Sequence, residues 1–350
     1  MSGPLEGIRI IELGGIGPAP FCCMMLADHG AEVITVHRPG IAPNSGDPLM
    51  RSRYTVEADL KSPDGVKKVR DLIKTADGFV EGFRPGVLER LGFAPDILHK
   101  ENPKLVIGRM TGWGQSGPLA QAAGHDINYI SITGALHAFG RANEKPTPPI
   151  NTVGDFGGGG MVLAFAMSAA LVKAARTGEG DIIDCAMTEG SSLLMSMMWG
   201  FKANARWKDE RGVNILDTGA HFYDTFETAD GKYISLASIE PQFYAQMLDL
   251  LELKSDPAFA EQMNPAVWPV LKEKVATAIR SKTRDEWCEI LEGTDVCFAP
   301  VLSMSEAPDH AHNKAREAFI SLDGVKQPAP APKFANSGTT KPRKPTPFKE

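Results

Sequence analysis

The first half of the chain alternates short apolar runs with helix-like segments, and this alternation restricts the fold more than any other feature of the sequence. IRIIEL at residues 8–13 predicts a strand, Pro20–Gly30 a helix and EVITV at residues 32–36 a second strand. An amphipathic helix over Ser62–Thr75 follows, with Ser62 as its N-cap and Pro63 at its first position. GFVEGF, KLVIGRM and DIIDCAM continue as strands, so we expect an α/β fold with a parallel sheet.

The turn GGIGPAP after the first strand resembles a dinucleotide-binding fingerprint. That fingerprint is GxGxxG, followed about 20 residues later by an acidic residue that holds the ribose. Gly15 and Gly17 match its first two glycines, but the third position is Pro20 and the second strand ends in His37-Arg38. Proline also removes a backbone N–H donor from the place where pyrophosphate would bind. The sequence therefore argues against NAD(P), and we expect the turn to serve the fold or to line a substrate passage.

The pattern changes after about residue 200. FYDTFETADGKYISLAS carries an Asp-Gly turn between β-rich runs, which is typical of an antiparallel hairpin. Helical patterns follow at Pro241–Leu251, Val267–Ser281 and Arg284–Glu292, so we expect a smaller α+β unit here. The last 25 residues, from Lys326, are rich in Pro, Lys, Ser and Thr and are expected to be extended or disordered rather than helical.

Charge and composition exclude several classes of function. The net charge of −6 argues against nucleic acid or an anionic membrane as the main partner. The five cysteines form no CxxC and no His lies at zinc-site spacing from them, so no metal site is expected. The start MSGPLEGIRI shows neither a signal core nor a transit pattern, and the end PFKE is not a peroxisomal tripeptide. Met161–Ala175 falls short of the roughly 20 residues of a membrane span and predicts a buried helix. We expect a cytoplasmic protein.

Four cations lie near the predicted ends of strands or helices. They are Arg38, Lys61 in ADLKSP, and Arg84 and Arg90 in EGFRPGVLERLG. Taken singly, each is most simply a solvated surface charge. Together they could hold a 3′-phosphate and a pyrophosphate, for which arginine is a suitable bidentate partner.

Six segments, in this order, resemble the family III CoA-transferase superfamily, and within it the branch of α-methylacyl-CoA racemases. The segments are ELGGIGPAPFCCMMLADHGAEVI, ADLKSPDG, EGFRPGVLERLG, GRMTGWGQSGPLAQAAGHDINYI, GDFGGG and RTGEGDIIDCAMTEG. The resemblance runs from residue 1 to about residue 310. It implies a large Rossmann-like α/β domain with a smaller α+β domain, in an interlocked homodimer whose subunits share the active site.

On this resemblance the chain divides into a large CoA-binding domain over residues 1–188, a linker over 189–225, a small domain over 226–308, and a return linker with a C-terminal segment packing on the large domain over 309–350. CoA would be part of the substrate, and no further cofactor is implied. By motif match the CoA contacts are Arg38, Ala58, Asp59, Leu60, Lys61, Gly82, Phe83, Arg84, Arg90, Gly124, His125, Asp126, Ile127, Asn128 and Tyr129.

Racemising a 2-methylacyl thioester sets clear chemical requirements. A proton must leave the carbon beside the carbonyl and return to the opposite face, so one base must stand on each face, with one of them protonated at the start. Donors must stabilise the enolate oxygen, and water must be kept from the intermediate.

Four residues are the candidates for this chemistry. His125, before a predicted helix start at Asp126, has an imidazole that can act near neutral pH as acid or base. Asp155 in NTVGDFGGGG is the second base, and it also fits an N-cap ahead of a glycine-rich helix whose glycines let substrate and backbone approach closely. The resemblance makes Glu240 a residue of the other subunit that orients His125. It makes the backbone N–H of Asp126 a donor to the enolate oxygen.

Two other functions remain open. In a CoA-transferase of the same fold, Asp155 would attack the thioester as a nucleophile and form a mixed anhydride. His125 and the stretch DTGAHFYDTF argue against it, because both resemble the racemases. A protein that binds acyl-CoA without turnover is the third possibility. Met110, Met187, Met195, Met197 and Met198 lie near the predicted site and could accept acyl chains of varied shape or simply fill the core. The acyl group itself is not specified.

Overall fold

The computed structural model describes residues 3–41, 44 and 46–349, so Met1, Ser2 and Glu350 of the terminal segments considered above lie outside the described residues. The chain forms two compact units. The first runs through Gly134 and includes residues 149–195 and the chain from Ala315 onward. The second comprises residues 135–148 and 196–314. Residues 135–148, inside the predicted large domain, thus pack with the second unit.

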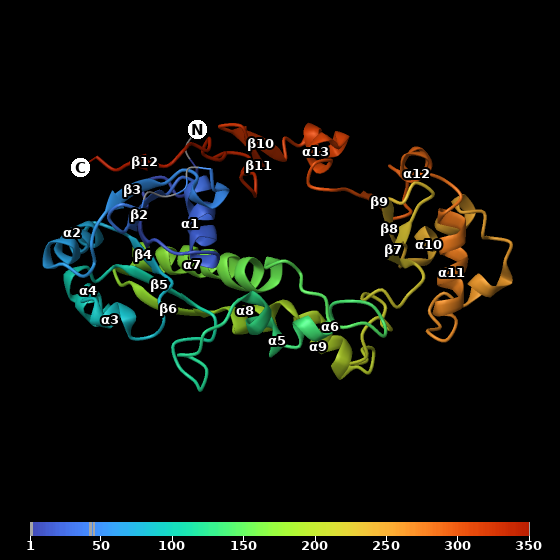
Figure 1. The fold of residues 1–350 in the computed structure, drawn as a ribbon, viewed down its shortest axis with the longest axis horizontal. Helices are drawn as coiled ribbons and strands as arrows, with labels where there is room; N and C mark the ends of the chain where they lie inside the picture. The colour runs from blue at the N-terminus through green and yellow to red at the C-terminus, as the bar shows by residue number, and fades with distance from the viewer. Residues whose placement is uncertain (1–2, 42–43, 45, 350) are drawn as a thin grey trace. The chain divides into compact units, whose positions relative to one another are not determined.

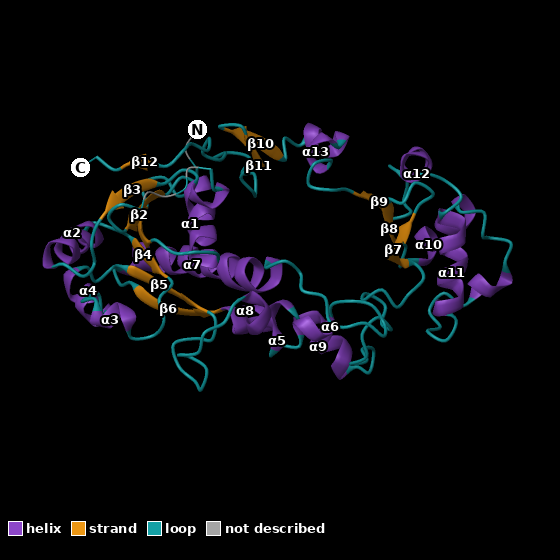
Figure 2. Ribbon diagram, in the orientation of Figure 1, coloured by secondary structure: helices purple, strands orange, loops and turns teal. Residues whose placement is uncertain are grey.

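The first unit is built on a sheet of seven described strands, and every pairing in it is parallel, as the strand–helix alternation predicts. Its order is β12-β3-β2-β1-β4-β5-β6 (Figure 2). The strands are β1 (Arg9–Leu13), β2 (Glu32–His37), β3 (Tyr54–Glu57), β4 (Gly78–Glu81), β5 (Val106–Thr111), β6 (Asp181–Ala186) and β12 (Thr346–Pro347). Ile11 of β1 lies between Ile34 of β2 and Phe79 of β4, and all three are fully buried.

Helices cover both faces of this sheet, so each face buries its own apolar cluster. α1 (Pro18–Asp28) and α7 (Val162–Thr177) pack on one face, and α2 (Pro63–Lys74), α3 (Val87–Arg90) and α4 (Pro95–Glu101) lie on the other (Figure 1). Strands covered on both faces read as continuous apolar runs, which is why IRIIEL and KLVIGRM were recognisable in the sequence. The N-cap of α2 is Ser62, whose hydroxyl accepts the Gly65 N–H at 3.0 Å, as predicted.

Helix α1 begins at Pro18, two residues before the predicted start at Pro20. Both prolines lie in its first turn, where backbone N–H groups have no helical acceptor, so proline costs nothing there. Gly17 precedes the helix with φ 71°, a left-handed conformation that favours glycine. The prolines and glycine of GGIGPAP therefore form the start of helix α1.

A buried ion pair fixes this helix start against the sheet. Arg53 and Glu12 are both fully buried, and the Arg53 Nε lies 2.9 Å from the Glu12 carboxylate. The same guanidinium donates to the Pro20 carbonyl at 2.7 Å. The pair joins the end of β1, the residue before β3 and the first turn of α1. These contacts fix both ends of the glycine turn that connects β1 to α1.

A π-helix, η2 (Thr152–Met161), continues directly into α7. The combined segment Thr152–Thr177 is the one described helix long and apolar enough to cross a membrane, but half of its most apolar window is buried inside the first unit, as in the core helices of soluble proteins. The expectation of a buried helix here holds for one face only, because Phe165 is 76% exposed and Val172 59% exposed. The cytoplasmic location stays a prediction.

Two strands of the sheet were not foreseen from the sequence. β3 reads YTVE, in which polar residues separate the apolar ones, and β12 has only two residues, so neither shows an apolar run. The residues from Lys326 to Lys349 contain no helix, as expected, and they are extended rather than disordered. β10 (Phe319–Leu322) and β11 (Val325–Pro328) form a hairpin, and β12 then joins the sheet edge beside β3. The Phe348 N–H donates to the Thr55 carbonyl at 2.9 Å.

The second unit is an α+β structure around a three-stranded antiparallel sheet, as predicted from the Asp-Gly hairpin. Three helices cover this sheet within a few residues of their predicted bounds. A buried cluster that includes Phe222, Trp268 and Trp287 forms its core. The elements of the unit are β7 (Tyr223–Glu227), β8 (Tyr233–Ala237), β9 (Phe298–Val301), α6 (Ala135–Ala138), α9 (Ser196–Ala203), α10 (Pro241–Leu250), α11 (Trp268–Ile279) and α12 (Arg284–Leu291).

Candidate active site

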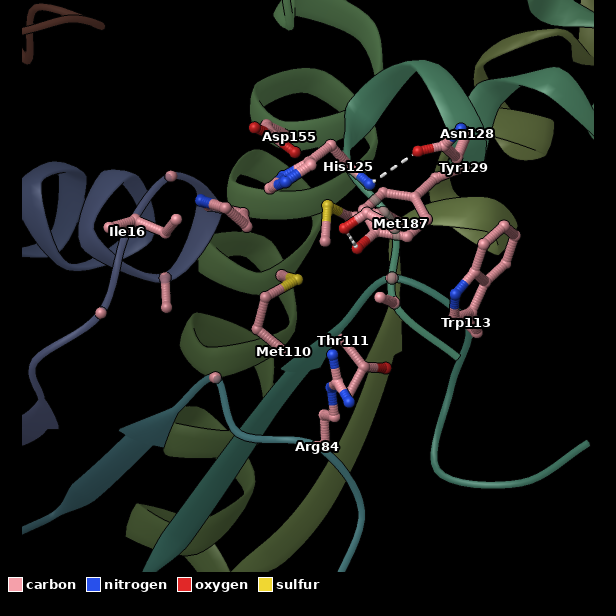
Figure 3. Close-up of a pocket in the computed structure, with 18 of the residues that line it drawn as sticks. Ile16, Arg84, Met110, Thr111, Trp113, His125, Asn128, Tyr129, Asp155 and Met187 are labelled. Carbon is pink, nitrogen blue, oxygen red and sulfur yellow. Dashed lines mark hydrogen bonds between the residues drawn. The ribbon is translucent and has the colours of Figure 1, made fainter. Parts of the chain in front are cut away.

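A cavity of about 890 Å³ opens in the first unit at the carboxyl ends of the parallel strands. It lies beside β1 and β4, where the strand order reverses direction, and open α/β sheets bind their ligands at this kind of position. The residues that line it are Gly15, Ile16, Gly17, Pro18, Ala19, Leu49, Gly82, Phe83, Arg84, Pro85, Met110, Thr111, Gly112, Trp113, Ala120, Ala122, Ala123, Gly124, His125, Asn128, Tyr129, Asn151, Asp155, Phe156 and Met187. His125 and Asp155, the two predicted bases, both belong to this set (Figure 3).

The opening glycine turn forms one wall of the cavity. Gly15 to Ala19 all line it, and Ile16 is 83% exposed. A Cβ at Gly17 would lie 3.3 Å from Oδ2 of Asp155, tighter than most real Cβ contacts. Of the two roles expected for GGIGPAP, the structure thus supports both: it starts α1 and it lines the candidate substrate cavity.

His125 stands immediately before α5 (Asp126–Ser131), as the sequence predicts. Its backbone N–H donates to the side-chain oxygen of Asn128 at 3.0 Å, which fixes the turn that carries the imidazole. The Tyr129 hydroxyl donates to the Gly124 carbonyl and pins the turn from its other side. The Tyr129 ring lies against Gly112 and Gly124 so closely that a Cβ at either glycine would overlap it. The imidazole is therefore presented to the cavity from a rigid support.

Asp155 projects into the same cavity from the first turn of η2, so the expectation that it is an N-cap is wrong. The N-cap is Asn151, in the left-handed conformation with φ 62°. Asn151 donates its side-chain N–H to Oδ2 of Asp155 at 2.8 Å, and the Asp155 N–H donates to the Asp126 carboxylate at 2.7 Å. Asn151 was not foreseen, although asparagine is a common residue in left-handed positions.

Burial raises the pKa of the Asp155 carboxyl above its ordinary value, and the nearby Asp126 carboxylate raises it further. The Asn151 hydrogen bond and the neighbouring His125 act in the opposite direction but do not cancel the shift. A carboxyl group with a raised pKa is a better proton donor near neutral pH than an exposed one. His125, the other predicted base, lines the same cavity.

The glycines after Asp155 let other backbone segments approach closely, as expected, whereas their role toward substrate stays a prediction. A Cβ at Gly158 would overlap Ser191 of α8 (Met187–Leu194), and one at Gly159 or Gly160 would press on Pro18 or Phe21 of α1. The run GGGG lets η2 pass close between α1 and α8. Glycine is required here by helix packing.

Methionine and aromatic side chains, together with small aliphatic ones, form the apolar part of the cavity. Met110 and Met187 lie beneath the two bases, and Trp113 stands to one side (Figure 3). Both methionines are nearly fully buried. Met195, Met197 and Met198 do not line this cavity, so only two of the five methionines noted in the sequence are placed at it.

The predicted CoA contacts divide into two groups. Gly82, Phe83, Arg84, Gly124, His125, Asn128 and Tyr129 line the cavity, whereas Arg38, Ala58, Asp59, Leu60, Lys61, Arg90, Asp126 and Ile127 do not. Arg38 follows β2, the Ala58–Lys61 segment follows β3, and Arg90 ends α3. Within the described residues, Arg38, Lys61, Arg84 and Arg90 are all exposed, and none of the four forms an ion pair with a carboxylate.

Glu240 lies in the second unit, as the N-cap residue of α10. Its expected role toward His125 stays a prediction. Asp126 is buried, and its carboxylate is used to hold the Asp155 N–H. In the described part of the chain, no acceptor is bonded to the backbone N–H of Asp126. No group of three or more His, Cys, Asp or Glu side chains in the described ranges could hold a metal ion.

Comparison with known proteins gives consistent results. The sequence profile of CoA-transferase family III matches residues 5–348. The chain is 45% identical to alpha-methylacyl-CoA racemase of Mus musculus, over 94% of this chain and 85% of that protein. It is 44% identical to the Homo sapiens protein of the same name, over 95% and 87%. Succinyl-CoA:glutarate CoA-transferase of Homo sapiens is 29% identical, over 89% and 75%.

Solved structures agree on the fold. A CaiB/BaiF family protein from Brucella suis matches with a TM-score of 0.83 at 24% identity, covering 99% of this chain and 97% of that chain. The Rv3272 protein of Mycobacterium tuberculosis matches with a TM-score of 0.80 at 26% identity, over 99% and 97%. The mixed α/β architecture is therefore shared across nearly the whole chain.

Proposed function

The chain belongs to CoA-transferase family III, and we propose that it is an α-methylacyl-CoA racemase, an isomerase that interconverts (2R)- and (2S)-2-methylacyl-CoA thioesters. The observation that carries this function is the convergence of His125 and Asp155 on one cavity. The two relatives at 44–45% identity bear the same name and support it. The chemistry is a 1,1-proton transfer through an enolate.

The proton transfer needs no group besides the two bases. The unprotonated base removes the C2 proton, and the electron pair of the C–H bond moves into the thioester carbonyl to form the enolate. The other residue then delivers its own proton to the opposite face of C2. Each turnover leaves the pair with its proton on the other residue, so the next turnover runs in reverse or follows exchange with solvent.

The enolate oxygen needs hydrogen-bond donors as its charge develops. The backbone N–H of Asp126 is the proposed donor, because it is unbonded and stands one residue after His125. Glu240, from the partner subunit, would orient the His125 ring and stabilise its protonated form. These roles are carried over from the family resemblance.

The CoA part of the substrate would be held by Arg38, Lys61, Arg84 and Arg90, which are exposed and have no carboxylate partners. Their positions at the carboxyl ends of β2 and β3 and around α3 place them on the edge of the sheet that carries the cavity. Unpaired arginines are suited to bidentate phosphate binding, because no existing ion pair has to be broken when the ligand binds. CoA enters as part of the substrate, and the proposed reaction uses no other cofactor.

A CoA-transferase is the alternative within the same family. Asp155 would then attack the thioester carbonyl and expel CoA, and no second base would be needed. The presence of His125 in the same cavity favours the racemase, because a transferase mechanism leaves this imidazole without a role.

One experiment separates the candidate functions. A 2-methylacyl-CoA is incubated with the protein in D2O, with and without an acceptor acid. We expect deuterium at C2 and loss of chirality in the absence of the acid, measured by mass spectrometry and chiral chromatography. Transfer of CoA to the acid without C2 exchange would show a transferase, and binding of CoA with neither change would show a non-catalytic binding protein.

We further propose that a second copy of the chain covers the exposed apolar stripe of the η2–α7 helix. Met161, Phe165 and Val172 lie on one side of this helix and are 52%, 76% and 59% exposed. A stripe of this kind is costly in water and marks an interaction surface. Sedimentation equilibrium should give twice the chain mass, and the variant Phe165→Glu should shift it toward the monomer. A monomeric wild type would exclude the dimer.

A further inference from the structure

The segment from Gly82 to Arg90 connects β4 to the end of α3 and carries two of the four unpartnered cations, Arg84 and Arg90. Its first residues, Gly82 to Arg84, line the cavity (Figure 3). Gly86, with φ 81°, lies inside the segment, and Gly92, with φ 84°, follows its end by two residues. A segment of this composition needs anchors if its cations are to be presented in a fixed arrangement.

The first anchor is the carboxylate of Glu81, the last residue of β4. Glu81 is fully buried, and its Oε2 accepts the backbone N–H of Phe83 at 2.7 Å. This bond sets the direction in which the chain leaves the strand, immediately before Arg84. A buried carboxylate stays charged only if a cation compensates it.

That cation is Arg109 on the neighbouring strand β5, directly opposite Glu81 in the sheet register. The Arg109 Nε donates to Oε1 of Glu81 at 3.0 Å. Its Nη1 donates to Oε1 of Glu89 at 2.9 Å, and Glu89 immediately precedes Arg90 in α3. One guanidinium, itself only 7% exposed, thus holds both the beginning and the end of the Gly82–Arg90 segment.

Arg109 also keeps these two carboxylates from the phosphate-binding cations. Without it, the negative charges of Glu81 and Glu89 would be uncompensated beside Arg84 and Arg90 and would compete with phosphate for them. Lysine could not replace Arg109, because a single ammonium lacks the fork that serves two carboxylates in different directions. The residue does not line the cavity and has no place in the proton transfer.

We propose that Arg109 is a positioning residue for the nucleotide part of acyl-CoA: its bonds to Glu81 and Glu89 hold Arg84 and Arg90 in the arrangement that receives phosphate. The inference rests on the proposed function, because it takes the ligand to be an acyl-CoA. It goes beyond that function by assigning Arg109 an effect on substrate affinity through the conformation of the Gly82–Arg90 segment.

The test compares two thioesters of the same 2-methylacyl group, one with CoA and one with pantetheine, which lacks the nucleotide. In Arg109→Lys, the KM for the CoA thioester should rise about 10-fold, equivalent to about 1.4 kcal/mol, while kcat stays within about twofold. The KM for the pantetheine thioester should not change. Arg70→Lys is the matched control, because Arg70 pairs with Glu101 in the same unit, away from the cavity.

Glu89→Met is the second variant and covers the case in which Arg109→Lys does not fold. Glu89 is partly exposed, so its replacement should leave the chain folded, and it removes only the bond between Arg109 and the end of the segment. It should weaken CoA binding in the same selective way. An equal loss for both thioesters, or an unchanged KM for the CoA thioester in the two variants, overturns the inference.

Titration of free CoA by calorimetry separates this inference from the proposed function. A wild type that binds CoA but does not racemise would refute the function, and the CoA affinities of the variants would still decide the role of Arg109. A wild type that binds no CoA would refute both.

Discussion

Two histidines of this chain, His125 and His221, lie in opposite environments. His125 is exposed at the cavity of the first unit, on a turn fixed by its backbone and by Tyr129. His221 is fully buried in the second unit, with the rings of Phe222, Tyr244 and Phe259 around it. Burial lowers the pKa of His221 to about 4, and the charge of Lys272 adds to the effect. His221 is therefore neutral at physiological pH and serves packing.

The contrast shows what a sequence motif alone leaves open. Both histidines occur in stretches that resemble the racemase branch, GHDINY and DTGAHFYDTF. Only the fold shows that one imidazole is rigidly held but open to ligand, while the other is bonded to the Tyr244 hydroxyl at 2.7 Å and closed off. A base needs access to the proton that it moves, and the core histidine has none.

The largest expected effect tests the open histidine. His125→Ala should lower kcat for racemisation by about 10³-fold, within the range typical of a lost general acid–base, and leave the Tm within about 2 °C of the wild type. The exposed His312 of α13 (Ala311–Ala315) is the control, and His312→Ala should leave kcat unchanged. Chiral chromatography of the product acyl groups gives the rates. Racemisation at the wild-type rate in His125→Ala would remove this residue from the mechanism.

The buried histidine should affect stability instead, in a pH-dependent way. The pKa of His221 is lowered to about 4 in the folded chain, against about 6.5 when unfolded, so the unfolded chain binds more protons between these values. The second unit should therefore lose up to about 3 kcal/mol as the pH falls from 6.5 to 4. Hydrogen exchange of β7 and α10 amides measures the loss. In His221→Leu this pH dependence should disappear, and a slope equal to the wild type would refute the assignment.

Much of the fold could be predicted because its strands and helices carry local signals. The strands β1, β2, β5 and β6 each contain a short apolar run, and α2 begins with Ser62 and Pro63, a start signal that the structure reproduces. β3 and β12 were missed because YTVE has no apolar run and β12 has only two residues. Their places are set by pairing with partners far along the chain, as Thr346 pairs with Tyr54.

The residues of the site that belong to sequence motifs could be predicted, whereas the residues that hold them in place could not. His125 and Asp155 were both identified from the sequence, and the structure brings them to one cavity. The role of Asp155 as an N-cap was wrong, because a π-helix starting at Thr152 places it inside the first turn. Arg109 contacts residues that lie 20 and 28 positions away in the sequence, and Asn151 acts from a left-handed backbone conformation, so no local pattern indicates either contact.

The smallest expected effect concerns the sign of a stability change at Asp155. The pKa of this carboxyl is raised in the folded chain, so its contribution to stability is present below the unfolded value near 4 and is lost as the pH rises through the folded value. The ionised Asp155 therefore destabilises the fold at neutral pH. Asp155→Asn should raise the Tm by about 1–2 °C at pH 7.5, and the gain should shrink as the pH approaches 4.

Asp71 of the same unit provides the opposite case. Lys67 and Lys74 lower the pKa of Asp71 to about 2, so its contribution is present above the unfolded value and is lost as the pH falls toward 2. Asp71→Asn should therefore lower the Tm slightly at pH 7.5, while Asp155→Asn raises it. Calorimetric scans of both variants at pH 7.5 and pH 4.5 give the two signs side by side. A lower Tm in Asp155→Asn at pH 7.5 would mean that the ionised Asp155 stabilises the fold. The energetic cost expected of an ionised carboxylate in this half-buried position would then be absent.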